Sequence, residues 1–211
     1  CNYSIGAGMM TPDYPLDNTG IEEKNIGGIV EYEGDCWSAK FSYRRNDRRS
    51  GVCLCVRNEA TSDFDATLLL DRPINYELYQ ADYEIERPYH LVSHDIALAR
   101  TKVTFDGGGE LETTYAYQVN DRREFDILRG DSPLAQYNFV LRTHTADALF
   151  RRTPTTLGPN LRLEGLAGLS GMFQDNFYYG RKLLSNYRAL SGGVFALERL
   201  IIGDVELEVG A

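Results

Sequence analysis

The residues best suited to metal or acid–base chemistry are few and scattered along the chain. It has three histidines, of which His90 and His94 are spaced so that both lie on one face of a strand. A metal site needs a third ligand, and His144 supplies one only if its strand lies close by. We therefore expect the histidines to lie in loops or on the water-facing side of strands, with no metal bound.

Other catalytic patterns are incomplete. Ser170 lies among glycines in "GLSGMF", but this is not the G-x-S-x-G nucleophile motif, and no strand-to-helix break follows it. The glycines of "FDGGGE" precede neither a helix nor a P-loop lysine, so they predict a turn. Acidic pairs such as Glu206 and Glu208 suit a glycosidase only at a separation that a sequence does not reveal. The sequence thus predicts a protein that is not an enzyme and carries no cofactor.

The spacing of the cysteines does not suit an ordinary zinc site. Cys53-x-Cys55 is too tightly spaced for an ordinary zinc pair, and no second pair follows it. In an oxidising compartment Cys36, Cys53 and Cys55 are candidates for a disulfide of unspecified connectivity. Cys1 is either the acylated N-terminal residue of a lipoprotein or the start of an internal piece.

Composition favours β-structure and excludes a general nucleic-acid binder. Aromatic residues make up 11% of the 211 residues, with 14 tyrosines, and this mix leans toward strands. The net charge of −9 leaves no basic footprint for nucleic acid. The chain also lacks the roughly 20 consecutive apolar residues of a transmembrane helix, whereas membrane-crossing strands give a much weaker hydropathy signal.

A rhythm of alternating segments predicts an antiparallel up-and-down meander. Tight turns, such as "DGGG" at 106–109, alternate with long connections at about 46–89, 121–135 and 174–188. This order places short turns at one rim and long, extracellular-type loops at the other, as in outer-membrane barrels. The expected strands are 1–10, 21–33, 36–45, 90–105, 110–120, 136–150, 161–174, 189–201 and 204–211.

Most expected strands have one face without charge. In 110–120 the odd-numbered residues from Leu111 to Val119 are uncharged and Glu112 lies on the other side. A lipid-facing Lys or Arg costs about 2–4 kcal/mol at the bilayer midplane, so a lipid face should lack charge. Asp147 is the one charged residue on an expected apolar face. We assign that face of its strand to Tyr137, Phe139 and Leu141, and Asp147 lies on the same side as these residues. Aromatic residues resembling interface girdles are Tyr115, Tyr117, Tyr137 and Phe173.

An ordered set of short patterns resembles the barrel of TonB-dependent outer-membrane receptors. The resemblance covers roughly residues 16–211, and it implies energised import of a scarce ligand, such as an iron chelate (siderophore), a vitamin or a glycan. It also implies contact with lipid in the outer membrane of a Gram-negative bacterium. In the intact receptor the partners are a plug domain and the TonB complex. The similar segments are "LDNTGIEEKNIGGIVEYEGDCWSAKFSYRRNDRRSGV", "YAYQVNDRREFDILRG", "FVLRTHTADALF", "GLSGMFQDN" and "NYRALSGGVFALERL".

The predicted fold is all-β, an antiparallel meander of about eight or nine strands from a larger transmembrane β-barrel of the 22-stranded type. So few strands cannot enclose a plug, and neither a plug domain nor a TonB box is recognised, so residues 1–211 are interpreted as part of a receptor barrel. Two alternatives stay open. One is a complete small outer-membrane barrel with a structural or adhesive role, closed by pairing of 1–10 with 204–211. The other is a soluble β-sheet binding module tethered at Cys1.

The rim of long loops is the predicted ligand-binding surface, because tyrosine rings and arginine forks suit ligand contact. The candidate residues are Tyr76, Tyr79, Tyr83, Arg122, Arg123, Tyr178, Tyr179 and Arg181.

Overall fold

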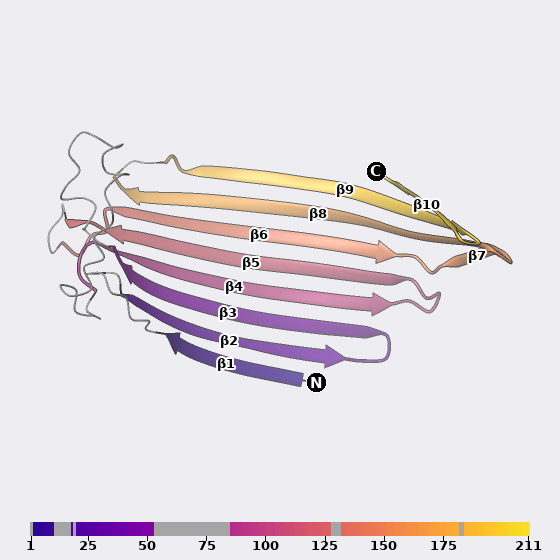
Figure 1. Ribbon diagram of the computed structural model, residues 1–211, viewed down its shortest axis with the longest axis horizontal. Coiled ribbons are helices and arrows are strands. Elements are labelled where there is room, and N and C mark those ends of the chain that lie inside the picture. Colours follow the sequence, from indigo (N-terminus) through magenta and orange to yellow (C-terminus); the bar gives the residue numbers. More distant parts are fainter. Residues whose placement is uncertain (1, 11–17, 19, 53–84, 128–131, 182–183) are drawn as a thin grey trace, which may run out of the picture.

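The computed structural model describes residues 2–10, 18, 20–52, 85–127, 132–181 and 184–211. These residues form one antiparallel sheet of ten strands (Figure 1). Neighbours in the sequence are neighbours in space, in the order β1-β2-β3-β4-β5-β6-β8-β9-β10, while the short β7 pairs only with β8. The all-β class and the up-and-down meander predicted from the sequence are confirmed.

The strands are long. Their bounds are β1 Asn2–Met10, β2 Ile21–Glu33, β3 Trp37–Gly51, β4 Tyr89–Thr104, β5 Glu110–Phe125, β6 Tyr137–Arg151, β7 Thr155–Gly158, β8 Leu161–Gly180, β9 Tyr187–Ile202 and β10 Val205–Gly210. The predicted strands correspond to all of these except β7, which lies between the expected strands 136–150 and 161–174.

Tight turns join the strands at one end of the sheet and long connections join them at the other (Figure 1). In the turn at 106–109, the Phe105 N–H donates to the Gly109 carbonyl at 2.8 Å, and Gly108 has a φ of 79°. At the β9–β10 hairpin Gly203 has a φ of 59° in the first central position, where a two-residue hairpin favours glycine. We call the two ends the tight-turn end and the long-connection end.

Three strands run further toward the long-connection end than the sequence predicts. β3 continues to Gly51, β5 to Phe125 and β8 to Gly180, so that the loops expected from 46, 121 and 174 begin later. The extensions of β3 and β5, residues 46–50 and 121–124, are polar on both faces, and alternation therefore disappears there from the sequence. The backbone ladder continues regardless, as in the register of Arg49 with Leu91 and of Leu91 with Arg123.

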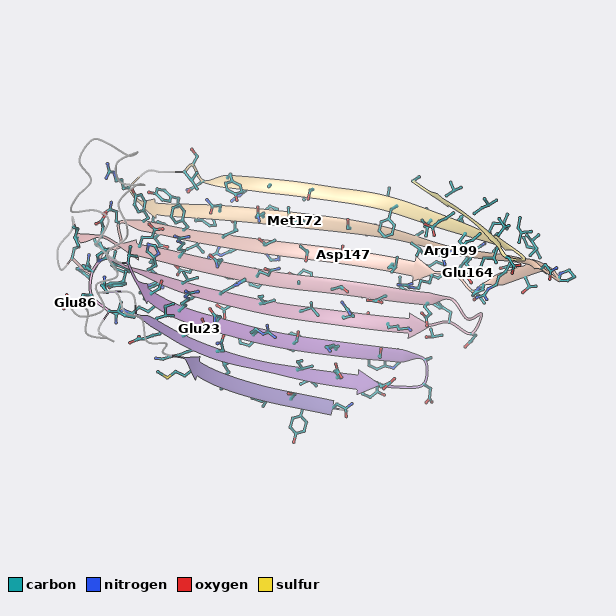
Figure 2. All side chains as sticks on the ribbon, viewed as in Figure 1. Glu23, Glu86, Asp147, Glu164, Met172 and Arg199 are labelled. Atoms are coloured by element: carbon teal, nitrogen blue, oxygen red, sulfur yellow. The ribbon has the colours of Figure 1, made fainter. Side chains whose placement is uncertain are left out.

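The two faces of the sheet differ in chemistry. We call one the apolar face, defined by Trp37, Phe41, Tyr117 and Leu169 and by the residues in register with them. The other is the polar face, defined by Lys40, Arg100, Glu112 and Asp147. Figure 2 shows side chains along the whole length of a single layer of strands, with Asp147 and Met172 toward the middle of the sheet.

The register corrects the prediction for β6. Asp147 is in register with Thr114 on β5 and Ser170 on β8, which places it on the polar face. The assignment of Tyr137, Phe139 and Leu141 to the apolar face was therefore wrong, and Tyr137 is no girdle residue. With the two faces of β6 exchanged, Asp147 is no longer a charged residue on the apolar face.

Neither face is covered by another layer of the described residues. Their buried hydrophobic side chains are Ile85, Ala116 and Phe125, whereas Leu190 and Val194 on the apolar face are each 84% exposed. The sheet is also open, because β1 pairs with β2 and β10 with β9, with no ladder between β1 and β10. No helix in the described part of the chain is long and apolar enough to cross a membrane.

Candidate functional site

An apolar band crosses the apolar face between the row of residues through Trp37 and the row through Tyr43. A row is the set of residues in register across the strands. Within the band the described residues include no Asp, Glu, Lys or Arg, although the polar face at the same height carries many charges. Aromatic side chains of the band are Tyr3, Tyr32, Trp37, Phe41, Tyr43, Tyr115, Tyr117, Phe150 and Phe173.

Aromatic rings gather along both edges of the band. Toward the tight-turn end the Tyr32 and Trp37 ring centroids lie 4.5 Å apart. Toward the long-connection end the His144 ring lies 4.6 Å from that of Tyr117 and 6.1 Å from that of Phe173. Polarizable rings thus mark two borders, as expected where apolar and aqueous surroundings meet.

The row immediately beyond Tyr43 is charged on most strands. Arg45 lies 3.5 Å from Asp95, and Arg188 lies 3.4 Å from Asp175. Asp47 lies two residues after Arg45 on β3. The Arg45 guanidinium and, less strongly, the Ser93 hydroxyl hold the pKa of Asp47 below its usual range. The charges therefore begin abruptly and in register across the sheet.

The predicted ligand-contacting residues divide between the two faces. Arg122 and Tyr178 lie on the polar face, in register on either side of Phe139, and the Tyr178 and Phe139 ring centroids are 5.0 Å apart. Arg123 and Tyr179 follow them on their strands and therefore point to the apolar face. Arg181 comes just after β8, and its N–H donates to the Gln136 carbonyl. Tyr76, Tyr79 and Tyr83 lie outside the described residues.

Both arginines of β5 are already paired with carboxylates. Arg122 contacts Glu124 at 2.9 Å, and Arg123 makes two contacts with Asp121, at 3.1 and 3.2 Å. The predicted set therefore forms two pairs, Arg122 with Tyr178 on the polar face and Arg123 with Tyr179 on the apolar face, the latter in register on either side of Asn138.

A belt of uncharged polar side chains, which sequence reasoning missed, lies below Arg122 on the polar face. We call this group the amide belt. It runs through two adjacent rows from β2 to β8, and its members become neighbours only through strand register. The amide belt comprises Asn25, Asn46, His94, Asn120 and Asn176 in one row and Gln118, Thr143 and Gln174 in the next.

Part of the amide belt is internally hydrogen-bonded. The Asn46 Nδ2 donates to Asn25 Oδ1 at 2.6 Å and to Glu23 Oε1 at 2.9 Å. On the other side the Gln174 Nε2 donates to Thr143 Oγ1 at 3.1 Å. Arg44, in the row of Gln118, is the one charged side chain in these two rows among the described residues.

The histidines do not form a metal site. His90 and His94 lie on the polar face of β4, as expected, but His144 lies two strands away on the apolar face, so its predicted water-facing position was wrong. Its Nδ1 is 2.7 Å from the Tyr115 hydroxyl. The described residues contain no group of three potential ligands. Burial lowers the pKa of His90, and the nearby Glu124 carboxylate partly opposes this.

Cys36 is exposed in the tight turn between β2 and β3, without a disulfide partner in the described part of the chain. The long connection that holds Cys53 and Cys55 leaves the sheet at the opposite end of β3, about 46 Å away at ~3.3 Å per residue. Those two cysteines lie outside the described residues, and their pairing stays a prediction.

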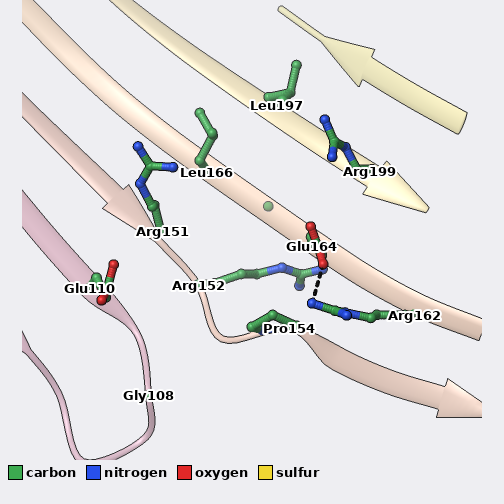
Figure 3. Close-up of a pocket in the computed structure, with 11 residues that line it drawn as sticks. Gly108, Glu110, Arg151, Arg152, Pro154, Arg162, Glu164, Leu166, Leu197 and Arg199 are labelled. Atoms are coloured by element: carbon green, nitrogen blue, oxygen red, sulfur yellow. Dashed lines mark ion pairs between the residues drawn. The ribbon is translucent and has the colours of Figure 1, made fainter. Parts of the chain in front are cut away.

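A concave region lies at the tight-turn end, with a volume of about 360 Å³. Figure 3 shows Arg162 paired with Glu164 in it, at 2.5 Å, and Arg151 and Arg199 on neighbouring strands. Arg199 is held by Glu206 at 2.8 Å and Glu208 at 2.9 Å, and these carboxylates raise its pKa. Since its cations are mostly paired, this region is a network of mutually compensated charges.

A scan of protein-family models finds no match to the chain, and a comparison with curated proteins finds none either. The resemblance to TonB-dependent receptors therefore stays a prediction, and the function has to be argued from the geometry of the two faces.

Proposed function

We propose that this sheet is part of the wall of an outer-membrane β-barrel of the TonB-dependent receptor type, which imports a scarce ligand. In this arrangement the apolar face meets lipid and the polar face lines the lumen. The long-connection end is extracellular and receives the ligand. The plug domain and the TonB complex are the partners that such an import requires, and the chain itself has no enzymatic role.

The observation that carries this proposal is the charge-free apolar band, crossing the sheet in register while the opposite face is charged. The height of the band fits a bilayer. Arg142 of β6 and Arg152, the residue that follows β6, border it, as do Arg188 and Glu198 of β9. Each pair is about ten residues apart, or roughly 33 Å along the strand, which a tilt of about 40° reduces to ~25 Å. That is the height of the apolar belt on outer-membrane barrels.

The exposure of the band supports lipid as its solvent. A soluble sheet buries its apolar face against a second layer, but here Leu190 and Val194 are 84% exposed. A contiguous apolar surface of this extent in water favours aggregation. In a bilayer the same side chains meet hydrocarbon, and no second layer is needed.

The open edges favour a large barrel over a complete small one. The closure ladder that a small barrel requires between β1 and β10 is not present. Unpaired strand edges are a liability in any solvent, and most severely in lipid, where no water satisfies their backbone groups. Further strands pairing with β1 and β9 satisfy both edges.

The only tryptophan of the chain tests the proposal directly. Trp37 lies on the apolar face at the edge of the band and is 45% exposed. After folding into phospholipid vesicles, we expect brominated acyl chains to quench its fluorescence and aqueous iodide to quench it weakly. Strong iodide quenching with no effect of brominated lipid contradicts a lipid-facing band, as does folding to the same sheet in buffer without lipid or detergent.

A further inference from the structure

The amide belt lies between charged parts of the polar face but is itself almost free of charge. Glu23, Arg48 and Arg122 lie in the row toward the long-connection end, and Lys40, Arg100 and Asp147 lie two rows toward the tight turns. Between them the side chains are amides, hydroxyls, one imidazole, the apolar Ile96 and Leu141, smaller apolar groups and the single cation Arg44. Most polar side chains of this surface therefore form hydrogen bonds without carrying a charge.

Two polar atoms at the β8 end of the amide belt are buried without a hydrogen-bond partner among the described residues. Asn176 is only 6% exposed, and its Nδ2 donates to nothing. The hydroxyl of Tyr178, the next polar-face residue of β8, is likewise buried and unpaired. Leaving such a group unsatisfied costs free energy in the folded protein. An unpaired donor retained beside a belt of amides indicates a site whose hydrogen bond is completed by a ligand.

We propose that the amide belt binds a neutral, hydroxyl-rich ligand, an oligosaccharide, laid across the strands from β2 to β8. This inference rests on the proposed function, in which the polar face lines the lumen of an uptake barrel. It adds the chemical class of the ligand and the wall residues that hold it.

Hydrogen-bonding capacity matches this ligand class. An amide carries both donors and an acceptor, and a sugar hydroxyl is likewise a donor and an acceptor, so the two pair in either direction. Anionic chelates are matched instead by arginine and lysine, through charge-assisted or bidentate bonds. The belt itself contains one cation, Arg44, and of the two cations in the adjacent row Arg122 is held by Glu124 at 2.9 Å and Arg48 lies in register with Glu23. Rows of neutral amides therefore favour a neutral partner.

Size and aromatic surface also fit an extended ligand. From Asn25 to Asn176 the belt crosses five strand-to-strand steps, about 24 Å at ~4.8 Å each. At the β8 end the rings of Phe139, Tyr178 and Tyr187 supply an apolar surface for the carbon side of a sugar ring. Tyr187 is 44% exposed, and its hydroxyl makes one long contact, 3.4 Å to Gln174 Oε1. Because this contact is weak, a ligand displaces the Tyr187 ring with little loss of free energy and reaches Asn176.

The test is calorimetric titration of the full chain, folded in detergent micelles, with neutral malto-, xylo-, laminari- and chito-oligosaccharides at millimolar concentration. An anionic ferric trihydroxamate is titrated in parallel. We expect at least one oligosaccharide to bind, and Asn120→Ala and Asn176→Leu each to weaken that binding about tenfold, the effect of one lost hydrogen bond. The matched control is Thr114→Ala, on the same strand and face as Asn120 but nearer the tight turns, which should leave affinity unchanged.

Asn176→Leu separates a binding role from a structural one. Because the amide is buried without a partner, replacing it by an apolar group of similar size should leave the free energy of unfolding unchanged or raise it, while the sugar loses a donor. Lower stability with unchanged affinity overturns the proposal.

The proposal is also overturned if no oligosaccharide binds, or if only the ferric chelate binds. If brominated lipid quenches Trp37 but no sugar binds, the proposed barrel is retained and the proposed ligand class is rejected. Sugar binding without lipid quenching retains the site and rejects the barrel.

Discussion

Replacing Ala146 by arginine puts a charge at the middle of the apolar band, about halfway between the border residues Arg142 and Arg152. Ala146 is exposed and in register with Tyr115 and Gly171. A side chain added at Gly171 meets only one backbone oxygen, at 3.9 Å. There is consequently room for the longer side chain, and a steric clash does not account for any loss of stability.

The expected loss follows from the solvent of that face. An arginine facing the bilayer midplane of an outer-membrane barrel costs about 2–4 kcal/mol. At ~1.36 kcal/mol per factor of ten, even the lower value corresponds to an approximately 30-fold change in the folding equilibrium. If the face met water instead, an exposed substitution of this kind would change stability by no more than about 0.5 kcal/mol.

The assay is reversible guanidinium unfolding from phospholipid vesicles, followed by Trp37 fluorescence. The matched control is Ser170→Arg, which introduces the same side chain at nearly the same height on the polar face, in register with Asp147. We expect Ala146→Arg to lower the free energy of unfolding by at least 2 kcal/mol relative to Ser170→Arg, the lower bound of the midplane penalty. Equal effects of the two arginines would refute the lipid-facing assignment.

Asn18→Ala should lower the free energy of unfolding by about 1–3 kcal/mol, because it leaves buried backbone groups unpaired. The Asn18 Nδ2 donates to the Pro88 carbonyl at 2.9 Å and its Oδ1 accepts from the Glu86 N–H at 2.8 Å, so a denaturant midpoint like that of the parent contradicts this role. Burial lowers the pKa of His90 below 6.5, so the unfolded chain takes up a proton before the folded one does, and stability should fall as the pH drops below about 6.5. His90→Gln should make the free energy of unfolding less dependent on pH below about 6.5. An unchanged slope would show that other groups cause the pH dependence.

Strand existence was predictable because alternation with a period of two is a local property. Leu111 to Val119 share one face in the structure, as the sequence indicated. β6 shows where the pattern is insufficient. Apolar residues occur on both of its faces, so a pattern count does not decide which face is which. Hydrogen-bonded register with Thr114 and Ser170 decides it, and reverses the prediction.

The candidate site was predictable only in part. Arg122 and Tyr178 were identified by residue type, but their neighbours Arg123 and Tyr179 were included too, because the expected loop conceals a strand in which successive side chains point to opposite faces. The amide belt was not found, since asparagines such as Asn25 and Asn176 are far apart in the sequence and unremarkable singly.

The sequence by itself determined the all-β class, the up-and-down order and the sorting of short turns from long connections, because each depends on residues within one or two strands. The tertiary structure decided the faces of β6, the length of the strands beyond the apolar band, the open edges and the alignment of amides and charges into rows. Those features depend on which residue lies opposite which across a strand pair. Pairing of backbone groups along the whole ladder fixes that register, and the sequence of a single strand does not determine it.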